Sequence, residues 1–208
     1  MAAKSDLSEA ELDARHAEKM RRKKEARAKI LATKTIEKGL LIVHTGKGKG
    51  KSTAAFGLVL RALGNGMNVA VVQFVKGKWQ TGERVALAKF GDQVTISTMG
   101  EGFTWETQDR QRDIAAAKAA WARAVELIND DRHAMVLLDE LNIVLRYDYL
   151  PVAEVVAALE EKPAGKHVIV TGRNARDELV EIADLVTDMT LVKHPFRSGV
   201  KAQAGIEF

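Results

Sequence analysis

Glycine and lysine alternate from residue 46 to residue 51, directly after an apolar segment that spans residues 40–44. Glycines let successive backbone N–H groups point into one concavity, where they can bind phosphate oxygens. The last lysine of such a loop supplies positive charge, and the hydroxyl residue after it can bind Mg²⁺ at the start of the next helix. The segment therefore predicts a triphosphate-binding loop, whose candidate residues are Gly46, Lys47, Gly48, Lys49, Gly50, Lys51, Ser52 and Thr53.

The loop is one residue shorter than the usual G-x-x-x-x-G-K-[ST] pattern. Counting back from Gly50 places Thr45 where the first glycine belongs, and Gly46 follows one residue late. A shorter loop is expected to hold the polyphosphate differently. Hydrolysis of the terminal phosphate is therefore not implied by the presence of the loop.

Two carboxylates, Asp139 and Glu140, end the apolar segment 135–138. A Mg²⁺ ion, or Mn²⁺ in its place, that bridges phosphate oxygens needs further oxygen ligands near Ser52. The two carboxylates could bind the metal directly, bind it through water, or orient the Ser52 hydroxyl. The sequence leaves these three arrangements open.

Two aromatic residues, Phe103 and Trp105, lie among glycines and charges in the segment 99–106. They could form a surface for a flat apolar ligand, or they could belong to a loop that folds back on its own sheet. Trp121 instead falls at helical spacing with other apolar residues, which predicts a place in the core.

The chain offers no obvious nucleophile of its own. It contains no cysteine, its five histidines show no metal-site spacing, and no Ser/His/Asp order with a nucleophile elbow is present. His44 precedes the loop within a strand and is expected to be a structural residue whose hydrogen bonds are satisfied. If covalent chemistry takes place, the second substrate must bring the attacking atom.

The excess of positive charge is confined to the N-terminal region. Residues 1–38 contain 11 Lys/Arg and 7 Asp/Glu, whereas residues 39–208 contain 21 of each. A nucleic-acid partner is not expected, because the N-terminal region has no aromatic residue and the remainder is neutral. A membrane partner is not expected either, since no apolar run approaches about 20 residues. The absence of cysteine suits a reducing cytosol, so the expected location is the cytoplasm.

Two regions are predicted, a helical arm over residues 1–38 and a body over residues 39–208. The arm lacks glycine and proline from residue 5 to residue 33, and Ser8 with Glu11 predicts a capping box. Its apolar stripe is thin, so its order is expected to need the body, a partner or a ligand. In the body, apolar strands alternate with helical patterns, which predicts an α/β fold with a mainly parallel sheet and helices on both faces. The predicted strands are 40–44, 69–75, 94–98, 135–138, 167–171 and 185–192.

Several blocks between about Gly39 and Phe208 resemble the corrinoid adenosyltransferase family of the cobalamin-biosynthetic type. The shortened loop is a feature of that family, although Lys47 and Ser52 replace the asparagine and threonine that are common there. The resembling blocks are residues 45–57, 102–107, 138–141, 147–151, 171–173, 192–196 and 199–203.

The resemblance implies a RecA-like P-loop fold and a transferase that moves the 5′-deoxyadenosyl group of ATP to the Co(I) of a corrinoid, releasing triphosphate. ATP is expected to bind in reverse, with its 5′ carbon facing the reaction. The segment from Gly46 to Ser52 would hold the triphosphate, and Arg61 would contact the nucleotide. Glu140 would join Ser52 at Mg²⁺, with Asp139 nearby.

The resemblance also assigns the aromatic residues and the arm. Phe103 and Trp105 would close the lower face of the corrin ring, which excludes the axial ligand and makes Co(II) easier to reduce. The N-terminal helix would fold over the bound corrinoid. A homodimer and a reduced flavin or flavodoxin-type reductant are further expectations from the family.

Two other functions fit parts of the pattern. A RecA-like P-loop ATPase could use the basic arm and would be stimulated by polynucleotide. A nucleotide-switched binding module would bind ATP without turnover on any corrinoid. The neutral body and the absence of an arginine-finger signature argue against both.

Overall fold

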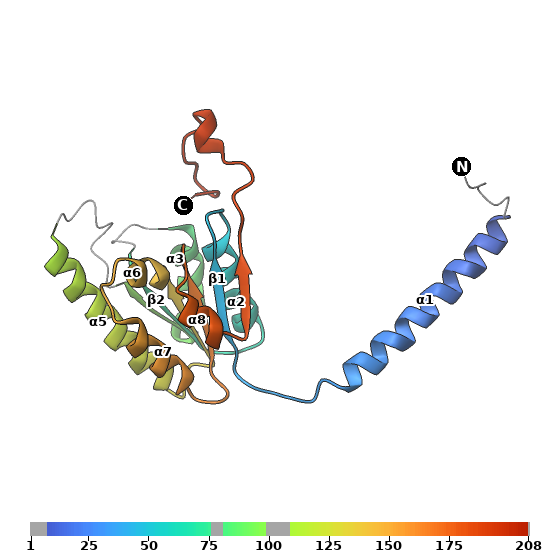
Figure 1. Cartoon of the computed structure of the whole chain (residues 1–208), viewed down its shortest axis with the longest axis horizontal. Helices are drawn as coiled ribbons and strands as arrows, with labels where there is room; N and C mark the ends of the chain where they lie inside the picture. Colours follow the sequence, from blue (N-terminus) through green and yellow to red (C-terminus); the bar gives the residue numbers. More distant parts are fainter. Residues whose placement is uncertain (1–7, 76–80, 99–108, 208) are drawn as a thin grey trace. The chain divides into compact units, whose positions relative to one another are not determined.

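The computed structural model describes residues 8–75, 81–98 and 109–207. The chain forms two compact units, Met1–Glu37 and Lys38–Phe208, which are described separately (Figure 1). No helix in the described part of the chain is long and apolar enough to cross a membrane.

The N-terminal unit consists of helix α1, Glu9–Ala32. Its first turn carries the predicted capping box: the Glu11 N–H donates to Ser8 Oγ at 3.4 Å, and the Ser8 N–H donates to Glu11 Oε2 at 2.9 Å. No residue of α1 is buried, and Leu12, Ile30 and Leu31 are exposed. The helix therefore obtains no packing energy from its own unit, which agrees with its thin apolar stripe.

The second unit is built on one sheet of six parallel strands in the order β3-β2-β4-β5-β1-β6. All six predicted strands are present, and the predicted α/β class with a parallel sheet is confirmed. Strand β6 is shorter than predicted: it ends at Asp188, opposite Thr45, which is the last residue of its neighbour β1. The strands are β1 Leu41–Thr45, β2 Val69–Gln73, β3 Val94–Thr98, β4 Met135–Asp139, β5 His167–Thr171 and β6 Leu185–Asp188.

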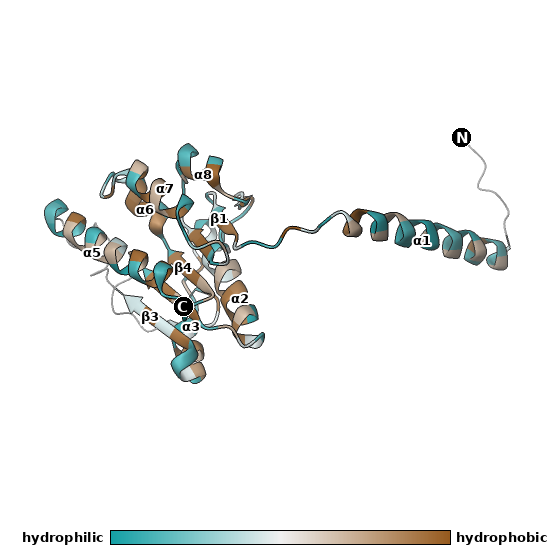
Figure 2. Ribbon diagram, turned by 90° about the horizontal axis from the view of Figure 1, so that it is seen from below, coloured by the Kyte–Doolittle hydropathy of each residue, from teal (hydrophilic) through white to brown (hydrophobic). Residues whose placement is uncertain are grey.

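Helices cover both faces of this sheet (Figure 2). Helix α2, Lys51–Gly64, and helix α3, Gly82–Leu87, pack on one face together with the 3₁₀ segment η1, Ala88–Gln93. The other face carries α5, Arg110–Asn129, and three shorter helices, and Trp121 of α5 is buried there as predicted. The shorter helices are α6 Leu141–Arg146, α7 Val152–Glu160 and α8 Asp177–Ile182, and a 3₁₀ turn, η2 Pro195–Ser198, follows β6.

Because every strand runs in the same direction, all six carboxyl ends meet at one edge of the sheet. The Gly-Lys loop follows β1 at this edge, and Asp139 ends β4 at the same edge. The fold thus brings the two candidate segments together across 87 residues of sequence.

Candidate functional site

The predicted phosphate-binding loop connects β1 to α2. Gly46 and Gly50 have φ angles of 98° and 104°, a region of backbone space that favours glycine. Gly50 is the residue before the first turn of α2, so the loop passes directly into the N-terminus of a 14-residue helix. Unpaired N–H groups at a helix N-terminus attract anions, which is the property that a triphosphate site needs.

The backbone that follows β6 supports the loop from one side. Gly48 donates its N–H to the Met189 carbonyl at 2.6 Å, and Met189 donates its N–H to the Thr45 carbonyl at 2.9 Å. A Cβ atom at Gly46 would lie 2.3 Å from Asp188 Oδ1, and one at Gly48 would lie 2.6 Å from the Met189 carbonyl oxygen. Both glycines are therefore required for the close approach to the end of β6, and Gly46 is required for its backbone conformation as well.

Lys51 lies beneath the loop. Its Nζ donates to the carbonyl oxygens of Gly46 at 3.0 Å and Gly48 at 2.5 Å, and only 7% of the residue is exposed. Burial lowers the pKa of the ammonium group, the charge of Glu140 acts in the opposite direction, and the nearby Arg173 lowers the pKa further. The loop carbonyls thus hold a buried cation within the predicted phosphate-binding loop.

Asp139 contacts the first turn of α2. Ser52 Oγ donates to Asp139 Oδ1 at 2.8 Å, Thr171 Oγ1 donates to the same oxygen at 2.8 Å, and Asp139 has no exposed surface. Among the three arrangements left open by the sequence, this geometry is the one in which the carboxylate orients the Ser52 hydroxyl. Since the hydroxyl hydrogen points to Asp139, the lone pairs of Ser52 Oγ are available to a metal.

Glu140 has a left-handed backbone conformation, with φ at 66° and ψ at 21°. Its N–H donates to Thr171 Oγ1 at 2.9 Å, and a Cβ atom at Gly172 would lie 3.2 Å from Glu140 Oε2. A non-glycine residue in this region is strained, and such strain persists where the surroundings hold it in place. The strained turn keeps the Glu140 carboxylate beside Gly172, within electrostatic range of Lys51.

The oxygen atoms of Ser52 and Glu140 are suitable ligands for a divalent ion that also binds phosphate. Within residues 8–75, 81–98 and 109–207, no three His, Cys, Asp or Glu side chains form a metal-binding group. A cage made only of carboxylate and imidazole ligands is therefore absent from that part of the chain. Mg²⁺ in phosphate-transfer sites is usually held by one or two protein oxygens together with phosphates and water, and Ser52 and Glu140 can supply the protein oxygens.

The expectation that the hydrogen bonds of His44 are satisfied is wrong. The imidazole is buried, and neither ring nitrogen has a hydrogen-bond partner among the described residues. His44 lies opposite Thr171 in the ladder with β5, but the Thr171 hydroxyl donates to Asp139 and accepts from Glu140. Burial lowers the pKa of the imidazole, which favours its neutral form.

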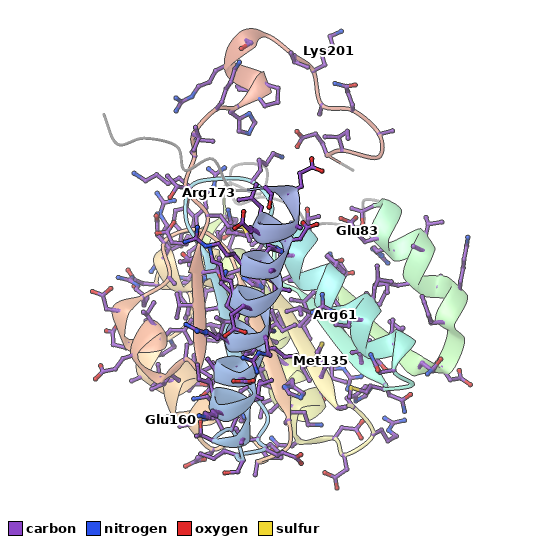
Figure 3. The ribbon with its side chains drawn as sticks, turned by 90° about the vertical axis from the view of Figure 1, so that its right-hand side faces the viewer. Arg61, Glu83, Met135, Glu160, Arg173 and Lys201 are labelled. Atoms are coloured by element: carbon purple, nitrogen blue, oxygen red, sulfur yellow. The ribbon has the colours of Figure 1, made fainter. Side chains whose placement is uncertain are left out.

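Other predicted residues lie apart from this centre. Lys47 and Thr53 are exposed, and Lys49 forms an ion pair with Glu207 near the C-terminus. Arg61 is exposed in the last turn of α2, ten residues and about 15 Å along the helix from Lys51. Figure 3 labels Arg61 on α2 and, well apart from it in that view, Arg173 after β5. Phe103 and Trp105 lie outside the described residues.

Three residues of the site were not predicted. Thr171 and Gln73 contact Asp139, and Arg173 lies close enough to Lys51 to lower its pKa. Gln73 and Thr171 end apolar strands, and Arg173 follows one. A polar residue at or just after the carboxyl end of a strand was therefore the signal that could have identified them. Thr171 and Arg173 also belong to one of the blocks that resemble the corrinoid adenosyltransferases.

Comparison with known families and proteins gives concordant matches. The family described as "ATP:corrinoid adenosyltransferase BtuR/CobO/CobP" matches residues 37–208, and "Cob(I)alamin adenosyltransferase N terminal" matches residues 5–31. A protein of Sinorhizobium sp named corrinoid adenosyltransferase is 65% identical over 198 residues, covering 94% of this chain and 92% of the relative. Proteins of the same name from Pseudomonas aeruginosa and Escherichia coli K12 are 54% and 47% identical, covering 95% and 94% of this chain and 98% and 99% of the relatives.

Replacing Gly46 with alanine should disrupt the loop. The added Cβ atom meets Asp188 and Met189 at a left-handed φ angle, so the free energy of unfolding is expected to fall by about 2 kcal/mol. ATP affinity should fall with it, as measured by calorimetry. Gly57→Ala is the control: Gly57 lies on the exposed surface of α2, where an added Cβ would meet no atom within 4 Å, and the change should raise stability by up to about 1 kcal/mol. A Gly46→Ala protein with unchanged urea midpoint would contradict the described packing.

The buried His44 should make the protein less stable in acid. Its pKa is lowered in the folded state from the ordinary value of 6.5, so below about pH 6.5 the unfolded chain binds a proton that the folded chain excludes. Stability should therefore fall as the pH drops from 7 to 5, and His44→Gln should reduce that slope by up to about 1.4 kcal/mol per pH unit. Urea unfolding at several pH values measures the slope. His133, whose pKa burial also lowers, contributes equally to both proteins, so identical slopes would contradict the prediction.

Proposed function

The chain belongs to the ATP:corrinoid adenosyltransferase family, and from that premise we propose that its loop holds the triphosphate of ATP so that the 5′ carbon faces a Co(I) corrinoid. The observation that carries the proposal is the shortened loop closed over Lys51, whose ammonium group lies at the start of α2, where it can neutralise a triphosphate leaving group. The chain's own residues then bind and orient the nucleotide. The attacking electron pair comes from the corrinoid.

In the proposed reaction, the Co(I) electron pair attacks the 5′ carbon of ATP. That pair forms the cobalt–carbon bond, the bond from the 5′ carbon to oxygen breaks, and triphosphate leaves with the electron pair of the broken bond. The main electrostatic task of the protein is to stabilise the departing anion. Lys51 is placed for this task, because it can exchange the carbonyls of Gly46 and Gly48 for phosphate oxygens.

We assign the divalent ion, Mg²⁺ or Mn²⁺, to Ser52 Oγ and the Glu140 carboxylate. The ion would neutralise part of the triphosphate charge. Asp139 then acts behind Ser52, accepting its hydroxyl hydrogen, rather than as a ligand. This division follows from burial, since Asp139 has no exposed surface whereas Ser52 and Glu140 are partly exposed.

The remaining expectations from the family form part of the same proposal. The segment 1–38 is assigned as a separate arm whose helix covers the corrinoid, a role that would give its exposed apolar residues a partner. Arg61 is assigned to contact the nucleotide. A reduced flavin or flavodoxin-type protein would supply the electrons, and the chain would assemble as a homodimer. The polynucleotide-stimulated ATPase and the nucleotide-switched module are not favoured, because family membership covers residues 37–208.

The direct test is to supply ATP, Mg²⁺ and chemically reduced cobalamin. The cobalt–carbon product should form, as followed by its visible spectrum, with one triphosphate released for each corrinoid adenosylated. Release of orthophosphate without an adenosylated corrinoid would reject the proposed function.

The two aromatic residues should matter most when Co(II) must be reduced. Replacing Phe103 and Trp105 together with alanine would leave the lower face of the corrin ring open to an axial ligand, which keeps Co(II) harder to reduce. Turnover from Co(II) with a reductant should therefore fall more than turnover from prereduced Co(I). Equal losses with both substrates would contradict a role in the reduction.

A further inference from the structure

A row of hydrogen-bonded side chains runs across three neighbouring strands at the carboxyl edge of the sheet. Thr98 of β3, Gln73 of β2 and Asp139 of β4 are paired in register at the ends of their strands. Thr98 Oγ1 donates to Gln73 Oε1 at 3.3 Å, and Gln73 Nε2 donates to Asp139 Oδ2 at 3.4 Å. With the Ser52 to Asp139 bond, the row connects edge strand β3 to the first turn of α2.

The orientation of the Gln73 amide follows from its two neighbours. An ionised carboxylate only accepts hydrogen bonds, so the amide must turn its NH₂ group towards Asp139. The amide oxygen then faces Thr98, whose hydroxyl can donate to it. Gln73 is 1% exposed, so an unmade hydrogen bond at either end would not be replaced by bulk water.

The two oxygens of Asp139 have different partners. Oδ1 accepts from Ser52 and Thr171, and Oδ2 accepts from Gln73. Rotation about the last side-chain bond of aspartate is loosely restricted, so the carboxylate plane is set by its hydrogen bonds. A donor on Oδ2 therefore helps to keep Oδ1 directed at Ser52.

We propose that Gln73 is a positioning residue of the metal site: it fixes the Asp139 carboxylate so that the Ser52 hydroxyl hydrogen points away from the metal of the bound nucleotide. Thr98 fixes Gln73 in turn. The proposal rests on the proposed function in one respect, the binding of a divalent ion together with ATP at Ser52. It adds β2 and β3 to the segments that determine this site.

The test is the Mg²⁺ dependence of ATP binding, measured by calorimetry on the full chain without corrinoid. Gln73→Met keeps the length of the side chain but removes both hydrogen bonds. The apparent Kd for Mg²⁺ in the presence of ATP should rise about tenfold or more, the range seen when residues behind a metal ligand are replaced. ATP binding in excess chelator should stay within about twofold of wild type, because the loop and Lys51 are unchanged.

Two threonine variants keep the test decisive if Gln73→Met folds poorly. Thr98→Val removes only the hydroxyl that orients the amide, and should raise the Kd for Mg²⁺ in the same direction by a smaller factor. Thr95→Val is the matched control, since it removes a hydroxyl from the same strand whose bond is to His133 at the other end of the sheet. It should leave the Kd for Mg²⁺ unchanged, even where it lowers the urea midpoint.

Folded Gln73→Met and Thr98→Val proteins with wild-type Kd for Mg²⁺ would overturn the proposal. A wild-type protein whose ATP binding does not respond to Mg²⁺ would overturn it as well. Failure of adenosyl transfer with the Mg²⁺ effects intact would instead reject only the proposed reaction, so the two outcomes are distinguishable.

Discussion

The hydrogen bond between the Ser52 hydroxyl and the buried Asp139 carboxylate joins the two segments from which the site is built. A carboxylate without exposed surface is strongly destabilising unless donors surround it. Ser52, Thr171 and Gln73 supply such donors from α2, β5 and β2. The contacts that stabilise the buried charge thus also determine the direction of the Ser52 oxygen, and the remaining geometry of the site depends on it.

The shape of the loop follows from the sheet next to it. Thr45, which stands where a longer loop would have its first glycine, is the last residue of β1 and pairs with Asp188 of β6. The loop is short because the strand continues one residue further. Its glycines then pack against the backbone that follows β6, and Lys51 is enclosed beneath them. A rigid enclosure of this kind suits the binding of a leaving group that must be neutralised without rearrangement.

Local pattern was sufficient to predict the six strands, the capped helix α1 and the burial of Trp121, because each depends on periodicity or on residues a few positions apart. The roles of Gln73 and Thr171 could not be predicted, since they depend on the register between strands far apart in sequence. The same limit explains the error at His44, because Thr171, which lies opposite it in the sheet, already bonds to Asp139 and Glu140. The sequence left three arrangements of the two carboxylates open. The position of Asp139 behind Ser52 could not be chosen among them, because it depends on the burial of Asp139 in the folded chain.

The most direct test of this account is a crystal structure of the protein with ATP, Mg²⁺ and a corrinoid. We expect Lys51 Nζ on phosphate oxygens in place of the Gly46 and Gly48 carbonyls, and Ser52 Oγ on the metal while it still donates to Asp139. The 5′ carbon should face the cobalt. A nucleotide with its terminal phosphoryl group facing the corrinoid, or a Ser52 hydroxyl separated from Asp139, would contradict the account.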